Sequence, residues 1–243
     1  MARIGIIGSE GRMGHALARA IAAAGHEAAG GVDKGGDVAS LADHSDVLLD
    51  FSAPFALDAN LHAAIGAGIP ILVGTTGLDE GHHAAIDATA RAIPVLQTGN
   101  TSLGVTLLAH LVREAASRLG PEWDIEIVEM HHRMKVDAPS GTAHLLGQSA
   151  AEGRGIDLAE NSERARDGQT GARERGAIGF ASLRGGTIAG EHTVIFAGEH
   201  ERLTLSHSAE DRMIFAHGAV RGAAWLIGQP PGRYSMGQVL GLG

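Results

Sequence analysis

Short apolar runs alternate with longer alanine-rich segments over the first hundred residues of the chain. The apolar runs predict strands at 3–8, 27–32, 46–51, 69–74 and 93–97. Good helix formers dominate the intervening segments and glycines lie at or near their ends, which predicts helices at 12–24, 55–66 and 79–91. Two of the runs, 46–51 and 69–74, are apolar on successive residues, as in strands covered on both faces. The alternation predicts a parallel sheet wrapped by helices.

The pattern changes after Asn100. A long helix is predicted over 102–119, strands at 177–184, 191–198 and 201–207, and an amphipathic helix at 211–227. Short glycine-containing turns between consecutive strands, such as 198–201, predict antiparallel hairpins. Residues 160–176 are rich in Arg, Glu, Gly and Asp and are expected to form a mobile loop. The second part is therefore an α+β unit, and the tail is expected to return to the first part.

Composition narrows the possible partners. A chain of 243 residues with 44% apolar residues can form two compact parts. The 19 Lys and Arg against 28 Asp and Glu give a net charge of −9, which repels nucleic acids and anionic membranes. Aromatic residues make up only 3% of the chain, too few for base-stacking platforms. We therefore expect no nucleic-acid partner and no membrane partner.

The chain contains no cysteine, which excludes disulfides, thiolate metal sites and cysteine nucleophiles. Catalytic groups must come from His, Lys, Asp, Glu, Ser or Thr. The first residues run directly into a strand pattern, and no stretch of about 18 apolar residues occurs. A cytoplasmic location is expected.

A glycine-rich turn follows the first predicted strand and opens the first predicted helix. It reads Gly8-Ser9-Glu10-Gly11-Arg12-Met13-Gly14, with spacing G-x-x-G-x-x-G in place of G-x-G-x-x-G. Glycine at this place lets backbone amides approach a pyrophosphate at the positive end of a helix. A sharp strand-to-helix turn without a ligand is the alternative. The position after the first strand, with Asp33 at the end of the second, favours a nicotinamide dinucleotide.

Three further segments are candidates for cofactor contacts. Asp33 can accept hydrogen bonds from ribose hydroxyls, whereas Lys34 beside it could meet a 2′-phosphate, so NADH and NADPH both stay open. The carboxyl ends of parallel strands meet at one sheet edge, where ligands bind. Two polar segments follow the fourth and fifth predicted strands: Gly74-Thr75-Thr76-Gly77 and Thr98-Gly99-Asn100-Thr101. Plain turns would also explain some of these glycines.

Basic side chains cluster in one segment of the second part. His131, His132, Arg133 and Lys135 precede Pro139 and the sequence Ser140-Gly141-Thr142. So many basic groups at the end of a strand are costly unless an anion neutralises them, which predicts a small acidic substrate. Ser140 is predicted to be the N-cap of a helix, and the amides of Gly141 and Thr142 would bind a carboxylate.

This segment has two other possible interpretations. His131 and His132 could bind a metal, but adjacent strand residues point to opposite faces and no partner at metal spacing supports it. No metal is expected. A basic surface turn would leave the Ser140-Gly141-Thr142 helix start unexplained.

Four motifs are specific enough to indicate a family: Gly-Arg-Met-Gly at 11–14, Gly-Thr-Thr-Gly at 74–77, Glu-x-His-His-Arg-x-Lys-x-Asp-Ala-Pro-Ser-Gly-Thr-Ala at 129–143, and Ile-Gly-Phe-Ala-Ser-Leu-Arg-Gly-Gly…Gly-Glu-His-Thr at 178–193. Over nearly its whole length the chain resembles the dihydrodipicolinate reductase family. The family is the 4-hydroxy-tetrahydrodipicolinate reductase of bacterial lysine and diaminopimelate synthesis.

The resemblance implies the fold and the roles of the parts. It implies a Rossmann-like, doubly wound dinucleotide-binding domain, formed by 1–101 and 214–243, and an α+β domain at 102–213 that binds substrate and builds a homotetramer. The implied reaction reduces a cyclic dicarboxylate with NADH or NADPH. By motif, the proton-handling groups fall on His131 and Lys135, and substrate-carboxylate contacts fall on His132, Gly141 and Thr142. Cofactor contacts fall on 8–13, Asp33, 74–76 and 98–101.

The chain departs from the family pattern at three places. Only 13 residues separate Val32 from Asp46, Asp33-Lys34 replaces a more familiar Glu-Arg, and Thr101 stands where Phe or Met is common. Two other functions share the same first domain. One is another imine or 2-hydroxy-acid reductase, such as an aspartate dehydrogenase, and the other is a dinucleotide sensor without catalysis.

Overall fold

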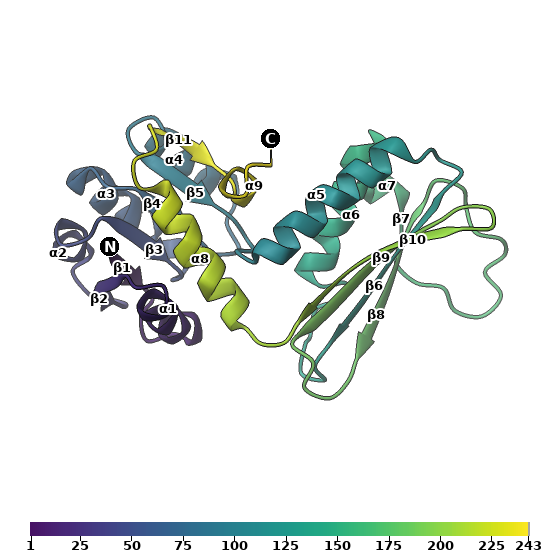
Figure 1. Cartoon of the computed structure of the whole chain (residues 1–243), viewed down its shortest axis with the longest axis horizontal. Helices are drawn as coiled ribbons and strands as arrows, with labels where there is room; N and C mark the ends of the chain where they lie inside the picture. Colours follow the sequence, from purple (N-terminus) through teal and green to yellow (C-terminus); the bar gives the residue numbers. More distant parts are fainter. Residues whose placement is uncertain (243) are drawn as a thin grey trace. The chain divides into compact units, whose positions relative to one another are not determined.

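The computed structural model describes residues 1–242 and divides into two compact units. Unit 1 consists of Met1–Leu103 together with the chain from Arg212 onward, and unit 2 is Gly104–Asp211 (Figure 1). Each unit has a sheet and a hydrophobic core of its own. Among the described residues, no helix is both long and apolar enough to cross a membrane.

The sheet of unit 1 is parallel throughout. Its described strands are, in spatial order, β11 (Gly232–Tyr234), β5 (Pro94–Gln97), β4 (Ile71–Val73), β3 (Val47–Asp50), β1 (Arg3–Ile7) and β2 (Glu27–Val32). The register pairs Ile7 with both Val32 and Asp50, and Val73 with both Asp50 and Gln97. The carboxyl ends of five strands therefore lie side by side along one edge.

Helices cover both faces of this sheet. One face packs against α1 (Arg12–Ala23) and α8 (Met213–Leu226). The other packs against α2 (Val38–Asp43), α3 (Leu57–Ala67) and α4 (Glu80–Thr89), with the short 3-10 helix η1 (Pro54–Ala56) leading into α3. Buried strands between two helical layers explain the continuous apolar runs of β3 and β4. The predicted Rossmann-like fold is confirmed.

Three short elements of unit 1 were not predicted. Helix α2 has six residues, and the carboxylate of its N-cap, Asp37, accepts from the Ser40 backbone N–H. Strand β11 has three residues and helix α9 (Met236–Val239) four. Elements this short contain too little periodicity to be recognised from the sequence.

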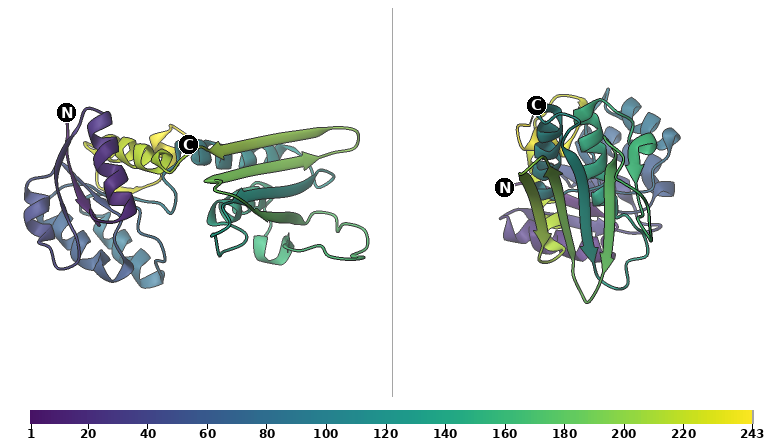
Figure 2. Two further views of the ribbon diagram at one scale, coloured as in Figure 1. Left: turned by 90° about the horizontal axis from the view of Figure 1, so that it is seen from below. Right: turned by 90° about the vertical axis from the view of Figure 1, so that its right-hand side faces the viewer.

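Unit 2 is a mixed sheet with helices on one face. The described strands run in the order β10 (Arg202–Ala209), β9 (Gly190–Ala197), β6 (Asp124–His131), β8 (Ile178–Arg184) and β7 (Ser162–Glu163). Helices α5 (Leu103–Arg118) and α6 (Gly141–Arg154) pack against one face, and α7 (Leu158–Asn161) contributes Leu158 to the same core. Figure 2 shows the green strands as one layer and the teal helices beside it. The predicted α+β unit is confirmed.

The pairing of consecutive strands in unit 2 corrects one expectation. Strands β9 and β10 form the predicted antiparallel hairpin. Strands β8 and β9 do not pair, because β6 lies between them, parallel to β8 and antiparallel to β9. Sequence order alone cannot reveal which strand takes the centre of a sheet. This placement matters because β6 ends at His131.

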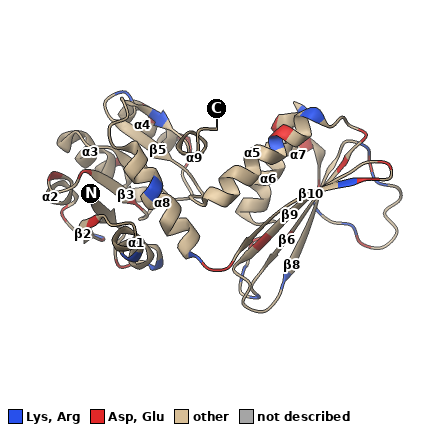
Figure 3. Cartoon of the chain, viewed as in Figure 1, with Lys and Arg blue, Asp and Glu red and all other residues tan. Residues whose placement is uncertain are grey.

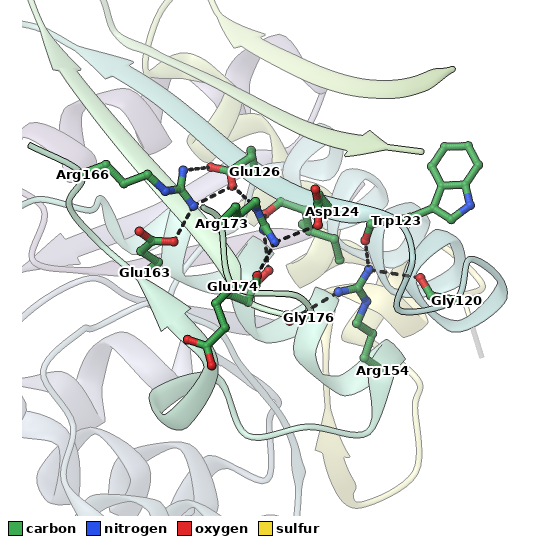
Figure 4. A network of polar contacts seen from close by, with 12 residues as sticks. Gly120, Trp123, Asp124, Glu126, Arg154, Glu163, Arg166, Arg173, Glu174 and Gly176 are labelled. Atoms are coloured by element: carbon green, nitrogen blue, oxygen red, sulfur yellow. Dashed lines mark hydrogen bonds and ion pairs between the residues drawn. The ribbon is translucent and has the colours of Figure 1, made fainter. Parts of the chain in front are cut away.

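Arginines hold the base of the loop predicted over 160–176. Arg166 donates to both oxygens of Glu126 on β6, at 2.9 Å each, and to Glu163 (Figure 4). Arg173 donates to Glu126, to Asp124 and to the carbonyls of Ile125 and Ala177. Arg154 of α6 donates to the Trp123 carbonyl. The loop is thus tied to β6 on the face that the helices leave open.

Charged residues are sparse on the strands of unit 1, where Figure 3 shows mostly tan ribbon. Its six described strands contain Arg3, Glu27, Asp50 and Arg233 as their only Lys, Arg, Asp or Glu. Of these, Asp50 is fully buried. A buried carboxylate at the ligand-binding edge of such a sheet needs hydrogen-bond partners.

Candidate active site

The glycine-rich turn after β1 has the geometry that a phosphate requires. Gly8 has a φ of +86°, and a Cβ at Gly14 would lie 2.2 Å from the Ser9 carbonyl oxygen, so a side chain at either position would disrupt the turn. Gly11 is the N-cap of α1, no side chain caps this helix, and its first turn has no acidic residue. The exposed residues Glu10, Gly11 and Arg12 therefore surround an uncapped helix start that fits an anion.

Asp33 is tied to this turn. Its Oδ2 accepts from the Ser9 hydroxyl at 2.7 Å and from the Glu10 backbone N–H at 2.9 Å. These contacts fix the carboxylate at the end of β2, on the same edge as the turn. Lys34 follows on the exposed surface. The structure thus brings the predicted ribose-binding pair and the predicted phosphate turn together.

The segment after β4 is built on the buried Asp50. The Thr75 hydroxyl donates to Asp50 Oδ1 at 3.1 Å, as does that of Ser52 at 2.6 Å, and the Asn60 amide donates to Oδ2 at 3.1 Å. Thr75 is buried, so its hydroxyl faces the protein interior, whereas Thr76 is exposed. Asp50 and Asn60 were not singled out from the sequence. The sequence signal that could have indicated Asp50 is a carboxylate within an apolar strand.

Hydroxyl groups after β5 also have partners within unit 1. Thr98 donates to the Asn100 carbonyl at 2.8 Å. Thr101 is buried and donates to the carbonyl of Phe215 in α8 at 2.6 Å. Gly99 is exposed and Asn100 is half-buried. The Thr101 side chain thus joins the segment before α5 to α8.

The basic segment of unit 2 begins at the end of β6 and continues beside the turn after β8. The Gly185 N–H donates to the His131 carbonyl, and the N–H groups of His132 and Arg133 donate to the carbonyls of Ile188 and Gly186. His131 is buried, whereas Met134 is 77% exposed and Val136 is 97% exposed. Lys135 donates to Asp137 at 2.8 Å. The segment therefore presents one buried imidazole and one half-buried ammonium group.

Glu129 lies at the centre of a buried polar cluster. Its Oε2 accepts from His131 Nδ1 at 2.5 Å and from Arg184 at 2.8 Å. Its Oε1 accepts from Arg184 at 2.8 Å and from the Ser140 backbone N–H at 3.2 Å. Only 1% of the Glu129 side chain is exposed. Glu129 therefore connects the end of β6, the end of β8 and the start of α6.

The ionisation of this cluster follows from its contacts. Burial opposes charge on Glu129, but the donors Arg184, His131 and Ser182 outweigh it and lower the pKa of Glu129 to about 2. Burial also lowers the pKa of His131, and the opposing effect of Glu129 offsets this only in part. Glu129 is thus a carboxylate, and His131 is a neutral imidazole at neutral pH.

Helix α6 begins as predicted. Ser140 is its N-cap and accepts from the Ala143 N–H at 3.1 Å, which leaves Gly141 and Thr142 as the first two helical residues. The Ser140 hydroxyl also contacts His192 Nε2 at 3.1 Å. Burial and the nearby His131 lower the pKa of His192 to about 4, and its Nδ1 has no hydrogen-bond partner. The predicted carboxylate site therefore lies beside the His131 cluster.

Glu129, Arg184 and His192 lie within the motifs at 129–143 and 178–193, but the sequence does not indicate their roles. Glu129 and His131 are two residues apart on a strand, a spacing that places them on one face. Arg184 pairs with His131, and His192 with Glu129, only through the register of β8 and β9 against β6. The first relation could have been found from the sequence; the other two required the strand order.

Two family models match nearly the whole chain. The model described as dihydrodipicolinate reductase, N-terminus, matches residues 2–101, and the model described as dihydrodipicolinate reductase, C-terminus, matches residues 104–240. The chain belongs to the dihydrodipicolinate reductase family. The resemblance inferred from the sequence is thereby confirmed.

Individual relatives agree with this family. A 4-hydroxy-tetrahydrodipicolinate reductase from Zymomonas mobilis is 53% identical, covering 99% of this chain and 97% of the relative. One from Rhodopseudomonas palustris is 51% identical with the same coverage. Among solved structures, a dipicolinate-bound dihydrodipicolinate reductase from Paenisporosarcina has a TM-score of 0.77 at 22% identity and covers 97% of both chains. That structural likeness supports the fold.

Proposed function

We propose that this chain reduces 4-hydroxy-tetrahydrodipicolinate to tetrahydrodipicolinate, with loss of water, in lysine and diaminopimelate biosynthesis. Its family and its relatives at 51% and 53% identity share this activity by name. The observation that carries the proposal is the buried Glu129–His131 pair, which lies beside the capped start of α6. It combines a proton-handling group with a carboxylate-binding helix start, which a cyclic dicarboxylate requires.

The residues of unit 1 fit NADH or NADPH. The turn at 8–13, which leads into the uncapped start of α1, would hold the pyrophosphate. Asp33, with Lys34 beside it, would accept hydrogen bonds from the adenosine ribose. The backbone at 74–76 and 98–101 would contact the nicotinamide half, because the hydroxyls of Thr75 and Thr101 are bonded within the protein. When bound, the cofactor supplies the hydride.

The residues of unit 2 would orient and neutralise the substrate. The amides of Gly141 and Thr142 at the start of α6 would bind one carboxylate. His132 would make another contact with the same substrate. The Paenisporosarcina relative binds dipicolinate, which has two carboxylates. Fixing both carboxylates orients the ring, and orientation contributes much of the rate of a bimolecular transfer.

His131 and Lys135 would handle the proton. The 4-hydroxyl of the substrate leaves as water together with a proton from the neighbouring ring carbon, which gives a conjugated imine. C4 then gains a hydride, and the neighbouring carbon must regain a proton to give tetrahydrodipicolinate. Since Glu129 occupies Nδ1 of His131, Nε2 is the nitrogen that can exchange a proton. The ammonium of Lys135 would stabilise developing negative charge or relay the proton. The two groups act as a coupled pair.

One assay tests the proposal. Freshly generated 4-hydroxy-tetrahydrodipicolinate is mixed with the protein, and NADH or NADPH absorbance is followed. We expect oxidation of at least one cofactor, one equivalent for each tetrahydrodipicolinate formed. Cofactor binding without oxidation would contradict the proposal and favour a sensor. Turnover of aspartate in its place would favour an aspartate dehydrogenase.

We also propose a homotetramer, which the family resemblance implies, and a cytoplasmic location. The face of the unit 2 sheet away from α5 and α6 contains Val128, Met130, Leu183 and Ile195, and Leu183 is 45% exposed. We expect Leu183→Glu to dissociate the tetramer in analytical ultracentrifugation. Leu203 serves as the control, because it is 40% exposed but lies opposite Phe196, on the face that the helices cover. A Leu203→Glu variant should stay tetrameric, and a monomeric wild type would refute the assembly.

A further inference from the structure

We propose that Glu129 and Arg184 are positioning residues, which hold His131 in one tautomer and adjust how strongly its imidazole binds a proton. The inference deepens the proposed function, in which His131 handles the proton of the reduction. Neither Glu129 nor Arg184 needs to touch the substrate for this role. Both act through the ring of His131.

The hydrogen bonds of Glu129 fix the tautomer. An ionised carboxylate only accepts hydrogen bonds, so the 2.5 Å contact requires His131 Nδ1 to be the donor. The two contacts from Arg184 and the one from the Ser140 N–H prevent the carboxylate from rotating away. Nε2 is left as the titrating nitrogen. It faces Gly190, where a Cβ would lie 3.0 Å from Nε2, so glycine leaves this nitrogen uncovered on that side.

Arg184 limits the effect of the carboxylate on the ring. Glu129 by itself would favour the imidazolium, because a negative charge in contact with Nδ1–H stabilises a protonated ring. Arg184 binds both Glu129 oxygens at 2.8 Å and so competes with the ring for the same negative charge. Arg184 itself is held by the carbonyls of Leu183 and Asp137. A partly neutralised carboxylate orients the ring without retaining its proton.

The other charged and titratable groups around His131 fit this arrangement. Lys135, in the segment after β6, adds a second positive charge that disfavours the imidazolium. His192 on β9 meets the ring edge-on, with 5.0 Å between ring centroids, and burial keeps it neutral. His207 on β10 lies opposite His192, and burial lowers its pKa as well. Asp137 is a further anion, but it is bound to Lys135. Glu129 is thus the anion in contact with the ring, and Arg184 is bound directly to it.

The two residues should therefore shift the titration of His131 in opposite directions. Arg184→Gln removes the competing cation, so the pKa of His131 should rise. Glu129→Gln removes the negative charge but keeps an acceptor for Nδ1–H, so the pKa should fall. We would measure both by NMR titration of the full-length protein with labelled histidine, identifying the His131 signals by their loss in His131→Gln. Shifts in the same direction, or no shift, would overturn the proposal.

Matched variants separate this role from a general loss of structure. Arg166 binds both oxygens of Glu126 on the opposite face of β6, so Arg166→Gln removes a similar pair and should leave the His131 titration unchanged. Arg184→Lys keeps the cation without the two-point contact and should give a smaller rise than Arg184→Gln. If Arg184→Gln fails to fold, the rise in Arg184→Lys decides the question, and its absence overturns the proposal.

Kinetics provide the second readout. If protonated His131 is required, the alkaline limb of kcat/KM should move to higher pH in Arg184→Gln and to lower pH in Glu129→Gln, and kcat of Glu129→Gln should fall about 10-fold or more. NMR shifts in a protein that does not reduce the substrate would refute the proposed function and leave this inference standing. Reduction without any NMR shift would refute this inference alone.

Discussion

Glu126 and Glu129 lie three residues apart on β6, and an arginine binds both oxygens of each, yet the two pairs occupy opposite faces of the sheet. The Glu129 side chain is 1% exposed and its arginine comes from the adjacent strand β8. The Glu126 side chain is 26% exposed and its arginines come from the loop after β7 (Figure 4). The same ion-pair chemistry therefore has two roles. On the face covered by the helices the ion pair also binds the titratable ring of His131. On the open face the ion pair fastens a loop to the sheet.

The largest difference between the faces should appear in catalysis. Lys135→Ala removes the half-buried ammonium group next to His131, and we expect kcat to fall about 10²- to 10⁴-fold, the usual contribution of a proton-handling side chain. Arg166→Ala, which removes a cation of the open face, should stay within about twofold because its partner is partly solvated. Steady-state cofactor oxidation measures both. Wild-type turnover in Lys135→Ala would remove Lys135 from the mechanism.

Stability should distinguish the two arginines next. Arg184→Met leaves Glu129 buried without its main partner, and we expect the free energy of unfolding to fall by about 3–5 kcal/mol. Arg166→Met should cost about 0.2–1 kcal/mol, because Glu126 keeps Arg173 and water. Urea denaturation at pH 7 compares the two. Equal losses of unfolding free energy in the two variants would mean that burial does not make the Glu129 pair more important for stability than the Glu126 pair.

The covered face should also be the more sensitive to acid. The pKa of His192 in the folded protein is lowered to about 4. As the pH falls below about 6.5, this histidine therefore becomes protonated in the unfolded chain before it does in the folded protein. Stability should therefore decline between about pH 6.5 and 4, by roughly 2–3 kcal/mol from this residue. His192→Gln should flatten that part of the profile, whereas His200→Gln, at a 91% exposed side chain, should not. Identical profiles in all three proteins would contradict the assignment.

The smallest effect is expected at an exposed charge of unit 1. If Lys34 meets a 2′-phosphate, Lys34→Ala should weaken NADPH binding about two- to fivefold and leave NADH binding unchanged. Fluorescence titration with the two cofactors measures this directly. Unchanged NADPH affinity would show that Lys34 does not contact the phosphate.

Much of the fold could be predicted because the apolar runs are long and bounded by glycines. The strand ends at Ile7, Val32, Val73 and Gln97 lie within one or two residues of their predicted places. The basic segment that contains His131 and Lys135 could be singled out because basic residues rarely cluster without an anion. The partners of these groups could not be found in the same way. Arg184 reaches Glu129 across 55 residues of chain, through a strand order that the sequence does not encode locally.

Hydroxyl direction was the second feature that the sequence did not reveal. Thr75 and Thr101 stand at the predicted places along the cofactor edge, but their hydroxyls donate to Asp50 and to the Phe215 carbonyl. Whether a short polar side chain points outward depends on which acceptors are buried nearby. Asp50 is such an acceptor, and only the assembled sheet shows how many donors surround it.

The strict alternation of buried and half-buried residues along β6 has a consequence for changes in chain length. Deleting or inserting one residue between Glu126 and Glu129 would invert every later side chain of the strand, since the repeat of a strand is two. Glu129 and His131 would then face the open side, and Met130 would face the helices. Substitutions along β6 can have graded effects, but we expect single-residue insertions and deletions here to abolish function outright, whereas the exposed tip at 167–172 should accept them.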